Sequence, residues 1–389
     1  MGIDTIEVLK FFVTAFSFVK YGKAVKLKWP DPWIEVKFIK TTKGAEGIVR
    51  KDCCVVEVGD AIGMKRIFRE MGYVVVAGVM NKEEVEKTKG LVWDYIEGAS
   101  SVKLALEGKV GMHPCVNRDD PKTWAASSWP DTLEGGIFPH FGVGHSRAAW
   151  FVRTRSKVQQ VFEGFWGAEA HGGLLASFDS MLLWRSGEVT DKGWFHIDQN
   201  PATNPGFQNV QGLVNLVRVV EGRGGNVVVP KSHSRFAEWA EHEDYKEKIG
   251  EVKGDDWMEV WGRDAVGAVC LELLEGDMLL WDSRLVHCSN GVEGGGGGER
   301  QEEVTRAAVL VTMYPKNRVG SDVRGARMEC VARGETGTHW ANRVRVLGAE
   351  RGAGREVEDT RVKMMRDSTD ALVNGLEGVL ELGGLALVG

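Results

Sequence analysis

Short hydrophobic runs separated by polar and glycine-rich turns dominate the chain from residue 174 to residue 314. They lie at 174–184, 193–198, 212–220, 226–229, 266–273, 278–281 and 307–314. Their length is typical of β-strands, and they follow one another without regularly alternating helices. This half of the chain is therefore predicted to be an all-β barrel or sandwich, with a jelly roll as the expected form.

Helical patterns precede this region. Residues 67–80 predict a short strand, and Asn81 with Glu84 three residues later makes a capping box that starts a helix. That helix is expected to run through Val85, Leu91, Val92 and Tyr95. Residues 153–166 predict another helix, with Val158, Val161 and Phe162 facing inward. Residues 108–148 are rich in Gly, Pro, Trp and Asp, and we expect irregular surface or a lid there.

Apolar segments near both ends are predicted to pack on the body. Residues 11–19 are apolar, but the run is too short to cross a bilayer and is flanked by charged residues. We expect a packed helix rather than a signal or membrane segment. Residues 371–382 are amphipathic and are expected to dock on the body.

The chemistry of the chain is concentrated in His196, Asp198 and His287. On a strand, His196 and Asp198 share a face because successive side chains alternate. His287 follows a second apolar run and would supply a third ligand. Two imidazoles and one carboxylate that leave the other metal positions open are the ligand set of non-haem Fe(II) oxygenases. The sequence thus predicts an enzyme with ferrous iron.

A second His-x-Asp sequence, at His242 and Asp244, tests how specific this motif is. It lies in the charged stretch 235–248, where Phe236, Trp239 and Ala240 recur at helical spacing. Residues two apart on a helix do not share a face, so this copy is interpreted as solvated surface.

Composition narrows the function classes. The chain has 389 residues and a formal net charge of −6, with a pI near 5.9, so nucleic acid and anionic membranes are disfavoured as partners. The six cysteines form no C-x-x-C pair, which excludes a regular zinc or disulfide framework and favours a reducing, intracellular and cytoplasmic setting. Nothing in the sequence sets an oligomeric state.

Four segments, in this order, resemble the phytanoyl-CoA dioxygenase-like family of Fe(II)/2-oxoglutarate oxygenases. They are residues 72–76 with the following helix, the His196-x-Asp198 pair, residues 224–233, and residues 276–287. The resemblance covers about residues 65 to 315. It implies a double-stranded β-helix (jelly roll, cupin-like) core in a mainly β protein with flanking helices (α+β), with ferrous iron and 2-oxoglutarate as cosubstrate. The chain departs from the family at Lys231, where glycine is frequent.

The resemblance also suggests how the cosubstrate is held. Ser289 matches a family position that hydrogen-bonds 2-oxoglutarate. The family's cosubstrate arginine follows the distal histidine more closely than Arg306 does, but Arg306 opens the apolar run 307–314 and would face the barrel interior. Arg300 lies in the Gly- and Glu-rich loop and is the alternative, whereas Arg318 lies past the strand. Gly294–Gly298 lacks the context of a phosphate-binding loop and is interpreted as a flexible insertion.

The sequence therefore predicts a dioxygenase that hydroxylates a small organic substrate and converts 2-oxoglutarate to succinate. The catalytic jelly roll would span residues 66–320, between an N-terminal extension, 1–65, and a C-terminal helical extension, 321–389. Substrate contacts are expected from Trp184, Arg185, Gln199 and Gln211. Two alternatives remain, namely an oxygenase that modifies nucleic acid or protein, and a metal-free jelly-roll binding module.

Overall fold

The computed structural model describes most of the chain. The described residues are 37–39, 54–133, 136–185, 194–221, 224–251, 257–290, 304–347, 355–373, 379 and 384–388. The apolar segment 11–19, the glycine run and Arg300 lie outside them, and so does part of the segment 371–382.

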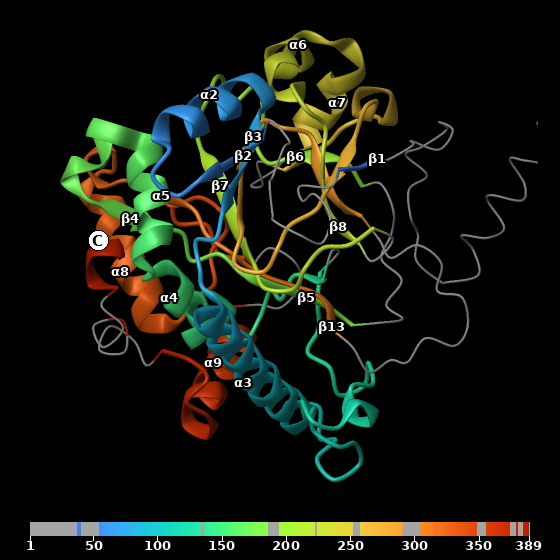
Figure 1. Ribbon diagram of the computed structural model, residues 1–389. Coiled ribbons are helices and arrows are strands. Elements are labelled where there is room, and N and C mark those ends of the chain that lie inside the picture. The colour runs from blue at the N-terminus through green and yellow to red at the C-terminus, as the bar shows by residue number, and fades with distance from the viewer. Residues whose placement is uncertain are drawn as a thin grey trace, which may run out of the picture.

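Two six-stranded sheets, mostly antiparallel, form the centre of the described structure (Figure 1). The first contains, in spatial order, β2 (Val55–Glu57), β3 (Tyr73–Ala77), β11 (Met278–Asp282), β7 (Val210–Asn215), β13 (Val304–Leu310) and β5 (Met181–Arg185). The second contains β1 (Lys37–Ile39), β10 (Val269–Leu271), β8 (Gly225–Val228), β12 (His287–Asn290), β6 (His196–Ile197) and β9 (Met258–Glu259). A separate pair joins β4 (Leu174–Ala176) to β14 (Met313–Pro315).

Buried apolar side chains explain why these strands form two layers. The strands of the first sheet are buried along nearly their whole length, as the patterns of β7 and β11 show. Sheets that are covered on both faces have such continuous apolar strands. The predicted α+β class with a jelly-roll core is confirmed.

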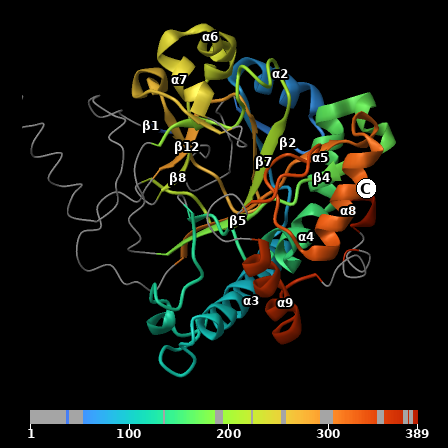
Figure 2. The same ribbon diagram turned by 180° about the vertical axis from the view of Figure 1, so that it is seen from behind.

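Helices cover the outer side of the first sheet and the periphery. They are α2 (Ala61–Met71), α3 (Lys82–Leu106), α4 (Arg147–Arg153), α5 (Ser156–Trp166), α6 (Phe236–Glu241), α7 (Glu243–Glu251), α8 (Ser321–Arg333) and α9 (Arg355–Ser368). Short 3-10 turns lie at Pro121–Thr123, Val143–His145, Gly167–Gly172, Ser232–Arg235, Gly262–Ala265, Lys316–Arg318 and Leu385–Leu387. Figures 1 and 2 both show α9 beside the long helix α3, and the two helices contact each other.

The capping box at Asn81 is confirmed. Its side chain accepts a hydrogen bond of 2.9 Å from the Glu84 N–H, and the Glu84 carboxylate accepts one of 3.0 Å from the Asn81 N–H. These two bonds satisfy donors that the first turn leaves free. The helix they start is α3, and it extends to Leu106.

The helix predicted over 153–166 is present as α5, which begins three residues later than predicted. Helix α4 ends at Arg153 and α5 begins at Ser156. Between them the Thr154 hydroxyl donates to the Trp150 carbonyl at 2.9 Å, and such side-chain bonds compete with the helical backbone. The inward face of α5 is as predicted, because Val158, Val161 and Phe162 are buried.

One buried guanidinium joins α8 to three other segments. Arg327 donates to the carbonyls of Ala176 in β4 at 2.5 Å and of Ala341 at 2.8 Å. It also donates to Leu387 at 3.3 Å and Val388 at 3.1 Å. The side chain is 1 % exposed, so backbone carbonyls supply the partners that a buried charge needs.

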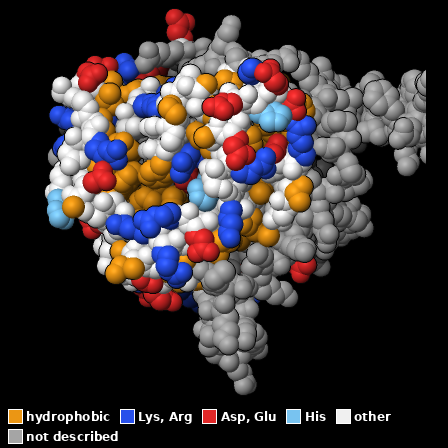
Figure 3. Space-filling view, turned by 90° about the horizontal axis from the view of Figure 1, so that it is seen from above, with side chains coloured by type: hydrophobic (Ala, Val, Ile, Leu, Met, Phe, Trp, Pro, Cys, Tyr) orange, Lys and Arg blue, Asp and Glu red, His pale blue; other side chains and the backbone are white. Residues whose placement is uncertain are grey.

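The surface carries both signs of charge. On the face shown in Figure 3, Lys and Arg side chains are interspersed with Asp and Glu, and no single sign dominates. In the described part of the chain, no helix has the length and apolar character required to cross a bilayer.

Candidate metal centre and cosubstrate site

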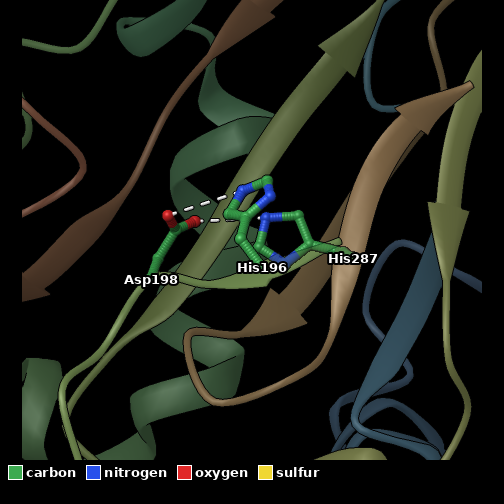
Figure 4. Close-up of side chains that lie close together, drawn as sticks. All are labelled: His196, Asp198 and His287. Carbon is green, nitrogen blue, oxygen red and sulfur yellow. Dashed lines mark ion pairs between the residues drawn. The ribbon is translucent and has the colours of Figure 1, made fainter. Parts of the chain in front are cut away.

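His196, Asp198 and His287 meet at one point between the two sheets. His196 in β6 is directly opposite His287 in β12 in the antiparallel register, and Asp198 follows β6 by one residue. The Asp198 carboxylate lies 3.7 Å from Nε2 of His196 and 3.1 Å from Nε2 of His287. Figure 4 shows the carboxylate pointing at both rings. One ligand atom of each residue lies within 4.8 Å of those of the others, which is close enough to hold one metal ion.

The backbone fixes which nitrogen of each imidazole faces this point. Nδ1 of His196 lies 3.0 Å from the Trp194 carbonyl, and Nδ1 of His287 lies 2.8 Å from the Leu285 carbonyl. A carbonyl only accepts hydrogen bonds, so each Nδ1 carries the proton and each Nε2 presents a lone pair. The indole of Trp194 stacks on the His196 ring at 4.3 Å and an interplanar angle of 9°.

The electrostatics of the three residues suit a divalent cation. Burial, reinforced by the neighbouring His287, lowers the pKa of His196 to about 3, so this ring is neutral near pH 7. Burial alone would raise the pKa of Asp198, but the facing His196 and His287 hold it well below its ordinary value. Two neutral imidazoles and one carboxylate are the donors that ferrous iron prefers in such sites.

Gln211 orients the carboxylate. From β7 on the facing sheet it donates a hydrogen bond of 2.9 Å to Oδ2 of Asp198. An outer hydrogen bond of this kind fixes the direction in which a ligand presents its lone pairs. The sequence predicted Gln211 in the substrate pocket, and in the structure it lines the cavity and also contacts a candidate ligand.

Arg306 projects from β13 toward the second sheet. Its guanidinium donates to Ser289 Oγ at 3.0 Å and to Asn226 Oδ1 at 2.6 Å, and it lies 4.6 Å from the centre of the Trp184 ring. The side chain is fully buried. Burial lowers the pKa of Arg306 to about 10, so it remains charged near pH 7.

Arg306 has no anionic partner among the described residues, and the two side chains that it contacts, Ser289 and Asn226, line the cavity beside the candidate ligands. Its Nε has no hydrogen-bond partner within the described residues, and both of its side-chain acceptors are neutral. A buried cation requires a counter-charge. The far carboxylate of 2-oxoglutarate has the fork geometry that a guanidinium matches, so these residues fit the cosubstrate.

A cavity of about 620 Å³ extends from the three candidate ligands. Both sheets contribute to its wall, as does the predicted lid through Thr132, Leu133 and Ile137. The remaining lining residues are Asp179, Leu182, Trp194, Gln211, Asn226, Trp257, Glu259, Trp281, Cys288, Ser289, Leu310, Thr338, His339, Trp340 and Leu347.

Three residues predicted to contact the substrate have other surroundings and are not among the described lining residues. Trp184 is buried against Arg306. Arg185 stacks on Trp129 at 4.1 Å and donates to the Trp124 carbonyl. Gln199 is fully buried, and its side chain bonds to the backbone of the following loop and to Ser283.

Several lining residues were missed by the sequence reasoning. Asn226 pairs with Ser289 across β8 and β12, a relation visible only once the register is known. Asp179 offered a signal, because it is an acid inside the apolar run 174–184. His339 and Trp340 lie in the segment interpreted as a C-terminal extension, and no local motif marks them.

The second His-x-Asp sequence lies on the surface. The side chains of His242 and Asp244 are 54 % and 45 % exposed, and Asp244 pairs with Arg263. His242 separates α6 from α7. The solvated interpretation of this copy is therefore confirmed.

Comparison with known proteins gives a consistent result. Residues 140–297 match the family model described as phytanoyl-CoA dioxygenase. The Ava biosynthesis cluster protein O of Aspergillus versicolor is 29% identical over 260 residues, which are 64% of this chain and 76% of that protein. A hypothetical protein from Escherichia coli has the same fold, with a TM-score of 0.52 and 14% identity over 86% of this chain and 85% of that one. The epimerase SnoN was solved with Fe3+, alpha ketoglutarate and nogalamycin RO. Its TM-score is 0.39, and it is 17% identical over 65% of this chain and 82% of that one.

Proposed function

We propose that the chain is an Fe(II)/2-oxoglutarate-dependent oxygenase of the phytanoyl-CoA dioxygenase family, whose model matches residues 140–297, and that it hydroxylates a small organic substrate. One oxygen atom of O2 would enter the substrate, and the other would enter succinate as 2-oxoglutarate loses CO2. The observation that carries this proposal is the convergence of His196, Asp198 and His287 on one wall of the cavity of about 620 Å³.

Each residue would have a separate task. His196, Asp198 and His287 would hold the iron from one side, which leaves its other positions for 2-oxoglutarate and dioxygen. Iron supplies the redox chemistry, and the protein supplies position and electrostatics. Gln211 would keep the Asp198 carboxylate in its orientation.

Arg306 and Ser289 would bind the far carboxylate of 2-oxoglutarate. The Arg306 guanidinium is already held by Ser289 and Asn226, so little side-chain freedom is lost on binding. Arg306 is buried, which strengthens its attraction for an anion relative to a surface arginine.

A small substrate is supported by the size and shape of the cavity. About 620 Å³ lies within the range of roughly 300–1,000 Å³ that is typical of small-molecule pockets. The interspersed charges on the face in Figure 3 offer no single-sign surface for nucleic acid. The relative named for a biosynthesis cluster also supports a small-molecule substrate.

The visible absorption of the ferrous complex tests the proposed function. Under anaerobic conditions, the protein with Fe(II) and 2-oxoglutarate should develop a weak visible charge-transfer band. His196→Ala should abolish the band, because two remaining protein ligands hold a labile ferrous ion poorly. His242→Ala removes the surface histidine of the second His-x-Asp sequence and should leave the band unchanged. A band that persists in His196→Ala would contradict the assignment.

A further inference from the structure

A carboxylate on the cavity wall lacks a cationic partner. Asp179 lies between β4 and β5 and lines the cavity, yet it is only 8 % exposed. Its carboxylate accepts a hydrogen bond of 2.7 Å from the Ser180 N–H. Within the described part of the chain, no Lys, Arg or His side chain forms an ion pair with it. A charge in this position is costly unless a partner arrives from the cavity.

The buried Arg153 guanidinium favours the ionised form of Asp179 through its charge, but its hydrogen bonds go to backbone carbonyls. Arg153 donates to the backbone carbonyl of Asp179 at 2.8 Å and to the carbonyl of Gly144 at 2.5 Å. Its bonds therefore leave the Asp179 side chain to the cavity. Burial raises the pKa of Asp179 to about 7, and a bound cation would favour the ionised form.

The rest of the wall suits a cation rather than an anion. Among the described lining residues there is no lysine or arginine, and the basic side chains are His196, His287 and His339, of which the first two are candidate metal ligands. Four tryptophans line the same cavity, namely Trp194, Trp257, Trp281 and Trp340. Indole faces attract ammonium and guanidinium groups because the ring faces carry negative partial charge.

Trp194 and Trp257 form one continuous aromatic surface next to the candidate ligands. Their ring centres lie 6.3 Å apart, and Trp257 lies 5.6 Å from the His196 ring. Both tryptophans are half-buried. Such a surface would guide a cationic group toward the metal-facing end of the cavity.

The proposed cosubstrate does not neutralise Asp179. Ferrous iron and Arg306 would together offset the charges of Asp198 and of the 2-oxoglutarate dianion. Asp179 then has the charge of Arg153 near it but no ion pair, so a cationic group on the molecule that occupies the rest of the cavity would be its direct partner.

We propose that the primary substrate carries a protonated amine or a guanidinium, and that the Asp179 carboxylate binds this group within the tryptophan-lined cavity. The inference rests on the proposed function, because it takes this cavity as the substrate site. It assigns Asp179 to substrate binding and to selection of cationic over neutral molecules.

Matched probes test this selection. Isothermal titration calorimetry under anaerobic conditions would compare 2-phenylethylamine, 2-phenylethylguanidine, 2-phenylethanol and 3-phenylpropanoate on the full chain with Fe(II) and 2-oxoglutarate. The pH should lie about 1.5 above the pKa of Asp179, where the carboxylate is ionised and the amine is still protonated. A hydrogen bond between charged groups predicts roughly 10- to 150-fold tighter binding of at least one cation than of the alcohol. Comparison of the amine with the guanidine shows which cation is preferred.

Two variants test whether Asp179 is responsible for the preference for cations. Asp179→Asn retains an oxygen that accepts from Ser180 and should bind the amine and the alcohol about equally. Asp244→Asn, on the surface, should retain the wild-type preference. Thermal melting checks the fold of each variant, and Asp179→Ser replaces Asp179→Asn if the latter does not fold.

The outcomes separate this inference from the proposed function. Equal binding of alcohol and cation by the wild type, no binding of either cation, or a preference that survives in Asp179→Asn overturns the inference. Absence of the charge-transfer band from the wild-type complex with Fe(II) and 2-oxoglutarate would instead contradict the proposed function. Because calorimetry registers probe binding without turnover, each result is obtained independently.

Discussion

Replacement of Arg306 by alanine should weaken 2-oxoglutarate binding far more than iron binding. The guanidinium is fully buried and donates to Ser289 and Asn226. Removing it would leave the far carboxylate of the cosubstrate buried without a counter-charge. Truncating one partner of such a pair costs about 2–5 kcal/mol, which corresponds to roughly 30- to 5,000-fold in affinity.

The assay is an anaerobic titration of 2-oxoglutarate into the ferrous protein, followed by the charge-transfer band. Iron content is measured separately and should remain close to the wild-type value. Arg318→Ala is the matched control, because Arg318 is 47 % exposed and pairs with Glu169 at the surface. If Arg306→Ala binds 2-oxoglutarate normally and Arg300→Ala does not, the cosubstrate is held from the loop before β13, and the argument from burial is wrong.

Three further perturbations address other parts of the structure. Gln211→Leu should weaken Fe(II) binding by roughly 10- to 100-fold through loss of an outer hydrogen bond, whereas Gln208→Leu, at a partly exposed position, should not; iron titrations measure both. Gly276→Ala should destabilise the fold by about 1–3 kcal/mol in urea unfolding, since φ is +80° and the added Cβ would lie 2.2 Å from a backbone oxygen; an equally stable variant would contradict this. Gly325→Ala has open space in a helix and should be neutral or stabilising by about 0.5–1 kcal/mol. Deleting Gly294–Gly298 should change stability little, because loop closure costs only about 0.6 kcal/mol per doubling of length; loss of 2-oxoglutarate binding in a folded deletion variant would show that the run belongs to the site.

Local patterns predicted most of the strands and the capping box because their causes are local, but the strand expected over 67–80 is only β3, from Tyr73 to Ala77, and residues 67–71 end helix α2. Alternation, turn residues and the Asn81–Glu84 pair act within a few positions of the chain. The juxtaposition of His196 and His287 was inferred from motif order, and the structure brings them together through the pairing of β6 with β12. That pairing joins segments about ninety residues apart, so it was foreseeable from the metal-ligand chemistry of the three residues and from the family resemblance, but not from local pattern.

Relations that depend on tertiary packing were not visible in the sequence. Arg185 and Gln199 carry polar groups near the metal motif or its flanking strand, but the direction of each side chain is set by neighbours distant in the chain, such as Trp129 and Ser283. Trp340 lines the cavity from beyond residue 320, so the predicted boundary there does not separate the site from the C-terminal region. The assignment of independent domains remains a prediction.

The hydrogen bonds of Arg327 have a practical consequence for protein engineering. This side chain connects Ala341, which directly follows a tryptophan of the cavity wall, to Leu387 and Val388. Removal of residues 385–388, or a fusion that displaces them, would leave buried donors without acceptors and loosen the neighbouring wall. Affinity tags are better joined to the opposite end of the chain. Libraries that seek new substrate specificity should vary His339 and Trp340 while Arg327 and its carbonyl partners are kept constant.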